Sequence, residues 1–330
     1  MIEHPHIKNL DKFFRGDSQL KFTGIEIGGT KCAVISGSIE TGIQDKIKFD
    51  TTNVDETIAN IIKAAEKLGT CDAIGISCGG PIDSKNGIIM SPPNLPGWDN
   101  IEIVRILAEK FNVPVGLQND ANACALAEWR FGAGRGTENM VFLTFGTGMG
   151  AGLILNGKLY SGTNDMAGEV GHIRMADYGP VGYGKTGSFE GFCSGGGIAK
   201  LGKILAEEKL QSGEVVSYCK SCDALENITA KSVAECAKHG DSDAIRVYDI
   251  CAEKLGAGIS ILIDILNPEK IVIGSVFERS EELLRDKMEK IVNSEALNYA
   301  RKVCEIVPAQ LGDSIGDWAA IAIAENVLRS

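Results

Sequence analysis

One local pattern occurs twice in this sequence, and it limits the folds that the chain can adopt. An apolar strand within residues 22–36 turns at Gly28-Gly29-Thr30-Lys31 and returns as a second apolar strand. Residues 140–155 repeat the pattern around Gly146-Thr147-Gly148-Met149-Gly150. Glycine turns carry no Cβ atoms, so their backbone N–H groups can approach phosphate oxygens. A matched pair, one in each half of the chain, predicts two domains that hold a polyphosphate from two sides.

Each hairpin taken alone has a second interpretation. The turn at Gly28–Lys31 is also consistent with a plain β-hairpin that has a type I′-like turn. A Walker-type phosphate loop is excluded, because no helix follows the turn directly. Glu26, just before the turn, is either an exposed strand residue or a carboxylate that helps to hold a cation through water.

Strands and helices alternate along the rest of the chain, which is typical of an α/β fold. Asp55–Leu68 has apolar residues at helical spacing, and the strand 72–78 ends in the tight turn Gly79-Gly80-Pro81. Further strands are expected at 43–49, 113–117, 270–273 and 302–307, and further helices at 101–111, 195–205, 281–292 and 314–328.

Asp120 stands where a short apolar strand, Val113–Leu117, gives way to a helix. Asn119 is a good N-cap, and residues 121–128 are strong helix formers. A carboxylate there faces the positive end of the helix dipole and lies at the carboxyl end of a strand, where open α/β sheets bind ligands. On this stretch alone Asp120 is either a general base or an ordinary capping carboxylate.

A stiff loop, Pro92–Trp98, carries one amide and one large aromatic side chain. Asn94 offers a donor and an acceptor together, which suits a sugar hydroxyl. The alternative is that Trp98 packs in the core and Asn94 caps a turn.

Composition narrows the class of protein. A chain of 330 residues is long for one core, and its net charge of −11 disfavours a nucleic-acid surface. No apolar run is long enough to span a bilayer, and the N-terminus has no signal-peptide core. The ten scattered cysteines indicate free thiols in a reducing compartment. We therefore expect a cytoplasmic protein that binds neither membrane nor nucleic acid.

The ordered motifs resemble those of the ROK family of sugar kinases and repressors. In sequence order they are IEIGGTK, CGGPID, PNLPGW, QNDANACALAE, FGTGMGAGLI and AGEVGH. The resemblance continues through residues 267–274 to residues 310–313 and covers almost everything from residue 22 onward. Several motifs in one order are far more specific than any one of them.

The resemblance implies an α/β fold of the actin-like (ribonuclease H-like) ATPase type, with two domains about a cleft that closes on a sugar. The implied small domain is 22–118, completed by the C-terminal helix 313–330. The implied large domain is 119–312, and residues 1–21 form an N-terminal extension. Dimers are common in the family, so the resemblance allows a homodimer.

The same resemblance assigns roles to matching residues. Asp120 would be the general base toward the attacking hydroxyl, and ATP with Mg²⁺ would be the phosphate donor. The other sugar hydroxyls would bind Asn94, Asn119, Glu169, His172 and Glu190. The phosphates and nucleoside would lie near Gly28, Gly29, Thr30, Lys31, Thr147, Gly148 and Gly274.

The sequence departs from the family pattern at three places. Many members hold a zinc ion with one His and three Cys, but Val181, Tyr183 and Ser188 stand at the cysteine positions. A lone His172 makes no closed zinc site, so we predict no structural zinc; His172 then binds sugar or is a satisfied core histidine. Glu26 replaces the usual aspartate, which shifts cation positioning. Residues 275–277 are bulkier than the family's glycine run, which puts donor specificity in doubt.

The sequence thus predicts an ATP-dependent hexose kinase, acting at the 6-hydroxyl of glucose or a close relative. A sugar-responsive repressor is disfavoured, because residues 1–21 are too few for a DNA-binding domain. A catalytically silent or regulatory sugar-binding protein is the remaining alternative. The residues do not decide among glucose, fructose, mannose and the N-acetylhexosamines.

Overall fold

The structure is a computed structural model, and it describes residues 20–329. The predicted N-terminal extension 1–21 therefore lies outside the described residues, apart from its last two. The chain divides into two compact units, and within the described residues these are 20–127 with 313–329, and 128–312. The first division falls inside helix α4 (Asp120–Phe131).

The first unit is built on a five-stranded sheet with the order β3-β2-β1-β4-β7. Its strands β1, β2 and β3 are antiparallel neighbours, and β4 and β7 run parallel to β1. The first predicted hairpin is confirmed, with Ile27 opposite Cys32. The strand bounds are β1 (Phe22–Ile27), β2 (Lys31–Ser38), β3 (Gly42–Asp50), β4 (Ala73–Cys78) and β7 (Val115–Gln118), with a small separate hairpin of β5 (Ile82–Asp83) and β6 (Ile88–Ile89).

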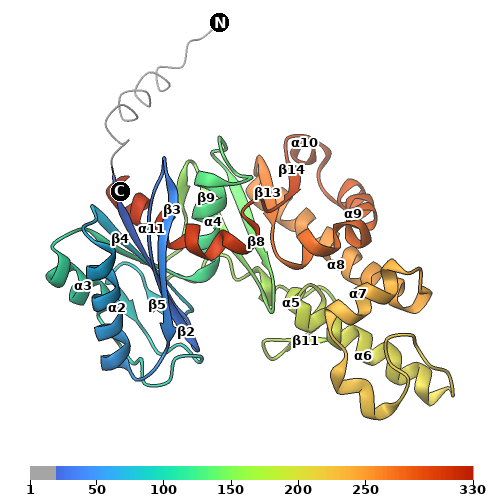
Figure 1. Cartoon of the computed structure of the whole chain (residues 1–330). Helices are drawn as coiled ribbons and strands as arrows, with labels where there is room; N and C mark the ends of the chain where they lie inside the picture. The colour runs from blue at the N-terminus through green and yellow to red at the C-terminus, as the bar shows by residue number, and fades with distance from the viewer. Residues whose placement is uncertain (1–19, 330) are drawn as a thin grey trace, which may run out of the picture. The chain divides into compact units, whose positions relative to one another are not determined.

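Helices cover both faces of this sheet. On one face α2 (Val54–Leu68) and α3 (Ile103–Phe111) contribute Ile61 and Leu107 to a core with Ile25 and Ile76, and on the other lies α11 (Ile315–Arg329). Figure 1 shows α2 and α3 on the side of the sheet opposite to α11. The last residues of the described chain therefore complete the first unit.

A row of three glycines lets α11 approach the sheet closely. Gly24, Gly75 and Gly116 are cross-strand partners on β1, β4 and β7. A Cβ at Gly24 would lie 2.7 Å from Ala320 Cβ, and one at Gly75 would overlap the Ala320 carbonyl oxygen. Because this face of α11 is rich in alanine and isoleucine, backbone packs almost directly on backbone.

The second unit repeats this topology. Its sheet has the order β10-β9-β8-β13-β14, with β8, β9 and β10 antiparallel and β13 and β14 parallel to β8. The second predicted hairpin is confirmed as β8 and β9. The strand bounds are β8 (Met140–Phe145), β9 (Met149–Leu155), β10 (Lys158–Leu159), β13 (Lys270–Ile273) and β14 (Glu305–Pro308).

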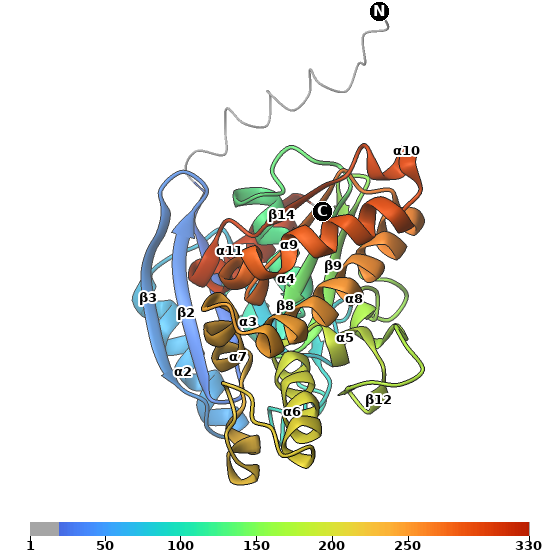
Figure 2. The ribbon, with the colours of Figure 1, turned by 90° about the vertical axis from the view of Figure 1, so that its right-hand side faces the viewer.

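Long helices fill the rest of the second unit. Figure 2 shows α8 (Ser242–Leu266) and α9 (Val276–Glu295) side by side, and together they form the largest helix–helix contact of the described chain. The shorter elements are η2 (Val170–His172), β11 (Val181–Gly182), β12 (Lys185–Thr186), α5 (Phe189–Phe192), α6 (Gly195–Gln211), η3 (Cys222–Asn227), α7 (Ala230–Lys238), α10 (Asn298–Arg301) and η4 (Gly312–Ser314).

The start of α9 adds one helical turn to the helix that the sequence predicted. The sequence predicted a helix from residue 281, and α9 does resume there after a non-helical break at Ser280, but a further helical turn begins at Val276. The Ser275 backbone N–H donates to Glu278 Oε2 at 2.7 Å, which satisfies one of the free N–H groups at the helix start. Residues 276 and 277 are therefore helical and do not form an open turn.

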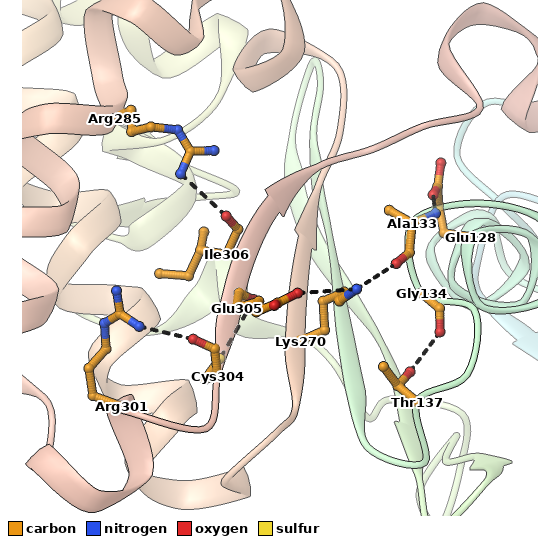
Figure 3. Close-up of polar contacts among 10 residues, drawn as sticks. All are labelled: Glu128, Ala133, Gly134, Thr137, Lys270, Arg285, Arg301, Cys304, Glu305 and Ile306. Carbon is orange, nitrogen blue, oxygen red and sulfur yellow. Dashed lines mark hydrogen bonds and ion pairs between the residues drawn. The ribbon is translucent and has the colours of Figure 1, made fainter.

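A buried carboxylate fixes the end of α4. Glu128 is fully buried, and its Oε2 accepts a hydrogen bond from Ala133 N at 2.7 Å. Its Oε1 accepts from Gln310 N at 3.0 Å and from Leu311 N at 2.8 Å. Figure 3 shows Lys270 on the other side of Ala133, whose carbonyl oxygen accepts from Lys270 Nζ at 3.0 Å. The two segments at which the chain crosses between the units are thereby tied together within the second unit.

Candidate active site

Asp120 is the first residue of α4, and the predicted cap before it is confirmed. Asn119 Oδ1 accepts a hydrogen bond from Asn122 N at 2.8 Å, which is the bond of an N-cap. Asp120 is therefore not the cap. Its Oδ1 instead accepts from the Ser77 hydroxyl at 3.3 Å. Ser77 lies near the end of β4 and is only 8% exposed, so the sheet fixes its position.

The surroundings of Asp120 change its acidity. Its side chain is accessible, but desolvation by the protein around it raises the pKa of Asp120, and the Ser77 hydrogen bond opposes that rise. The helix dipole alone predicts the opposite direction. A carboxylate with a raised pKa holds a proton more tightly, and this is the property that a general base needs.

Asn94 lies beside Asp120. A Cβ built on Gly79 would be 3.5 Å from both amide atoms of Asn94 and 3.7 Å from Asp120 Oδ2. The amide and the carboxylate thus flank the same bare backbone at the end of β4. Trp98, which is 1% exposed, packs in the core as one interpretation predicted, whereas Asn94 itself is exposed and accessible to a ligand.

The first glycine turn lies against the same loop. A Cβ at Gly29 would overlap the Asn94 carbonyl oxygen, so only glycine fits there. Gly28 N donates to Lys31 O at 3.1 Å, and Thr51 Oγ1 donates to Gly28 O at 2.6 Å. Neither Gly28, Gly29 nor Thr30 has a positive φ, so the type I′-like turn is wrong. Thr30 and Lys31 are exposed.

In the second unit Glu190 lies against the other glycine turn. Glu190 Oε2 accepts from Met149 N at 3.1 Å, and a Cβ at Gly148 would lie 2.7 Å from the same oxygen. Gly146 O accepts from Gly195 N, at the start of α6, at 2.7 Å. Thr147, the residue between Gly146 and Gly148 in this turn, is exposed. One predicted sugar residue and one predicted phosphate turn are therefore in contact.

The segment Gly168–His172 packs along β9. Ala151 N donates to Gly168 O at 2.8 Å, and a Cβ at Gly171 would lie 3.3 Å from Glu190 Cβ. These contacts bring Glu169 and His172 near Glu190. Both side chains are exposed, so the interpretation of His172 as a core histidine is wrong.

The positions at which the family carries zinc cysteines have other roles here. Val181 and Tyr183 are 42% and 83% exposed on the β11–β12 hairpin. Ser188 is buried, and its Oγ accepts from Gly191 N at 3.1 Å, capping α5. This cap places Glu190 in the first turn of α5. The absence of structural zinc stays a prediction.

A pocket of about 660 Å³ lies entirely within the second unit. This size suits a ligand such as a nucleotide. The pocket is lined by the Gly146–Thr147 turn, by the first residues of α6 and α9, and by α7. Its apolar surface comes from Ala199, Ile228, Ala230, Ala234 and Val276.

Residues 274–277, which the sequence analysis expected near the nucleoside, differ in their relation to this pocket. Phe277 is fully buried in the core and does not line the pocket, so it does not narrow it. Ser275 and Val276 do line it. Gly274 is buried behind them, where a Cβ would lie 3.2 Å from the Phe142 ring.

Glu26 is held by a lysine. Lys46 Nζ lies 3.3 Å from Glu26 Oε2 and also pairs with Asp317 at the start of α11. Burial raises the pKa of Glu26, and Lys46 opposes that rise. Within residues 20–329 no group of three or more His, Cys, Asp or Glu side chains is placed to hold a metal ion. Through Lys46, which also pairs with Asp317, Glu26 connects the sheet of the first unit to α11.

Comparisons with known proteins identify the family to which the chain belongs. The sequence pattern of the ROK family matches residues 22–327. A glucokinase from Halalkalibacterium halodurans is 34% identical over 309 residues, which cover 89% of this chain and 92% of that protein. A xylose repressor from Caldicellulosiruptor bescii is 31% identical, over 76% of this chain and 61% of that protein.

A solved structure is similar along nearly the whole chain. It is a ROK family glucokinase from Streptomyces griseus in complex with glucose and AMPPNP, 28% identical, with a TM-score of 0.71 over 92% of this chain and 99% of that one. The chain belongs to the ROK family and has its two-domain actin-like α/β fold. It is a sugar kinase. In the described residues no helix is both long and apolar enough to cross a membrane.

Proposed function

We propose that this chain transfers the γ-phosphoryl group of ATP to the 6-hydroxyl of glucose, with Asp120 as the general base. The observation that carries the proposal is the pairing of the accessible Asp120 carboxylate with the Asn94 amide at Gly79. A carboxylate and an amide side by side offer a proton acceptor and a hydroxyl-binding group to one sugar. The similarity to glucokinases supports the choice of glucose.

The proposed step is an in-line displacement. The sugar oxygen attacks the γ-phosphorus while the bond to the bridging oxygen breaks, and that bond's electron pair leaves with ADP. Asp120 takes the hydroxyl proton. Phosphoryl transfer has a loose transition state, so most of the rate comes from positioning and charge neutralisation. Ser77 would hold Asp120 in place through the step.

The other predicted sugar residues offer accessible polar groups. Asn119 uses its Oδ1 as the cap, which leaves its amide NH₂ for a hydroxyl. Glu190 accepts one backbone N–H and keeps its other oxygen, and Glu169 and His172 are accessible. Glucose presents several neighbouring hydroxyls, and these residue types match them.

The donor would be ATP, with its nucleoside in the pocket of the second unit and its phosphates along the second glycine turn. Mg²⁺ would arrive with the ATP phosphates, because the described residues form no dedicated metal cage. When bound, it neutralises phosphate charge. Lys31 adds an accessible cation beside the first turn.

A coupled assay for ADP release, with ATP, Mg²⁺ and a panel of hexoses, tests this function. We expect turnover on glucose above fructose, mannose and N-acetylhexosamines. Sugar binding by calorimetry, measured in parallel, separates the alternative of a silent or regulatory sugar-binding protein. Binding of glucose without turnover on any hexose would overturn the kinase proposal. The homodimer and the cytoplasmic location stay predictions.

A further inference from the structure

Three cationic side chains line the pocket of the second unit, and two of them have anionic neighbours. Lys238 Nζ lies 2.8 Å from Glu282 Oε1 and also donates to the Arg279 carbonyl oxygen at 2.9 Å. Lys231 Nζ lies 3.9 Å from Glu235 Oε1. These pairs neutralise much of the positive charge along α7.

Arg279 differs from both lysines. Across residues 20–329 no carboxylate lies within ion-pair distance of its guanidinium group. Its Nη2 donates to Ser275 Oγ at 3.4 Å, and its side chain is exposed. The pocket therefore contains one guanidinium charge that no protein anion compensates, and a guanidinium group is well suited to bind phosphate.

Ser275 places this guanidinium group beside the phosphate-type turn. A Cβ on Gly146 would lie 3.6 Å from Ser275 Oγ, so the hydroxyl is in contact range of the second glycine turn. Ser275 has a φ of 63°, a conformation that favours glycine. The Glu278 carboxylate holds it there through the Ser275 N–H at 2.7 Å. Strained residues of this kind are concentrated at ligand sites.

We propose that Arg279, oriented by Ser275, binds the polyphosphate of the nucleoside triphosphate donor and helps to determine donor specificity. This inference rests on the proposed kinase function and names a residue that the family resemblance did not assign. The apolar surface formed by Ala199, Ile228 and Ala234 favours a nucleoside triphosphate over inorganic polyphosphate, which would leave that surface uncovered. Ser275, which is larger than a glycine, would thus add to the donor site the hydroxyl that orients Arg279.

Calorimetric titration of ATP with Mg²⁺, in the absence of hexose, tests the inference. We expect Arg279→Gln to weaken ATP binding by about 10-fold or more, as for loss of a charged hydrogen bond. Arg279→Lys keeps the charge and should restore part of the affinity. The matched control is Arg246→Gln, which removes an exposed charge from α8 outside the pocket and should change affinity by about twofold at most. Glucose affinity should not change in any of the three.

Unchanged ATP affinity in Arg279→Gln would overturn the inference, as would an equal loss in Arg246→Gln. Inorganic tripolyphosphate that binds as tightly as ATP would overturn the nucleoside preference. The readout is independent of the reaction. Wild-type protein that binds ATP through Arg279 but phosphorylates no hexose would reject the proposed function and leave this inference standing.

Discussion

The Ser77 hydroxyl donates a hydrogen bond to Asp120 Oδ1 at 3.3 Å. Ser77 lies near the end of β4, and Asp120 is the first residue of α4, the helix that follows β7. Both residues belong to the first unit, and the parallel pairing of β4 with β7 brings them together. The carboxylate proposed as the base is therefore positioned by the sheet.

This hydrogen bond predicts the pH dependence of the reaction. Desolvation by the surrounding protein raises the pKa of Asp120 and the Ser77 hydrogen bond lowers it, so the acid limb of the wild-type kcat profile should lie above the ordinary aspartate range. The base works only when ionised, so kcat falls as pH falls through that pKa. Ser77→Ala removes the lowering effect and should move the inflection to higher pH. Ser77→Thr, which keeps the hydroxyl, serves as the control; an unchanged inflection in Ser77→Ala would reject the coupling.

The glycine row under α11 predicts a strong size limit. Gly75→Ala places a Cβ against the Ala320 carbonyl oxygen, and overpacking of this kind should lower the free energy of unfolding by about 1–3 kcal/mol. Gly80→Ala is the matched control, since a Cβ there meets no atom within 4 Å. Urea unfolding measures both, and equal stability of the two variants would show that the close packing is not required.

We expect Glu128→Gln, which replaces one carboxylate oxygen by an NH₂ group, to lower the stability of the protein. The two oxygens of Glu128 accept three backbone N–H groups, so Glu128→Gln must turn an NH₂ group toward at least one of these donors. The variant should lose about 1–3 kcal/mol of unfolding free energy in urea. Glu295→Gln, on an exposed turn of α9, provides the control. No difference between the two would contradict the tie at Glu128.

The residues at the usual zinc positions predict a metal-free loop. Val181, Tyr183 and Ser188 supply no thiolate, and Ser188 caps α5 instead. Elemental analysis of the purified protein should find much less than one zinc ion per chain, and a chelator should leave the melting temperature unchanged. One tightly bound zinc ion per chain would contradict the prediction.

Local patterns allowed much of the fold to be predicted. Both hairpins, the Asn119 cap and the strand Lys270–Ile273 follow from spacing and turn chemistry, which act over a few residues. The approach of Asn94 to Gly29 was not predicted, because it depends on how a distant loop packs.

The errors and omissions have the same origin. The Ser77 contact, the buried Glu128 and the glycine row join residues far apart in sequence, so no local spacing reveals them. The type I′-like turn was wrong, because neither Gly28, Gly29 nor Thr30 has a positive φ. The helical turn before the Ser280 break in α9 was not predicted.

The central claim is that Asp120 is the general base. Its most direct test is to measure both kcat and glucose affinity in Asp120→Asn. The amide keeps nearly the same shape but accepts no proton, so kcat should fall by about 100-fold or more, as expected for loss of a general base. Calorimetry should show glucose binding close to that of the wild type, because Asn94, Glu169, His172 and Glu190 remain. Retained kcat in Asp120→Asn would contradict the assignment of Asp120 as the base.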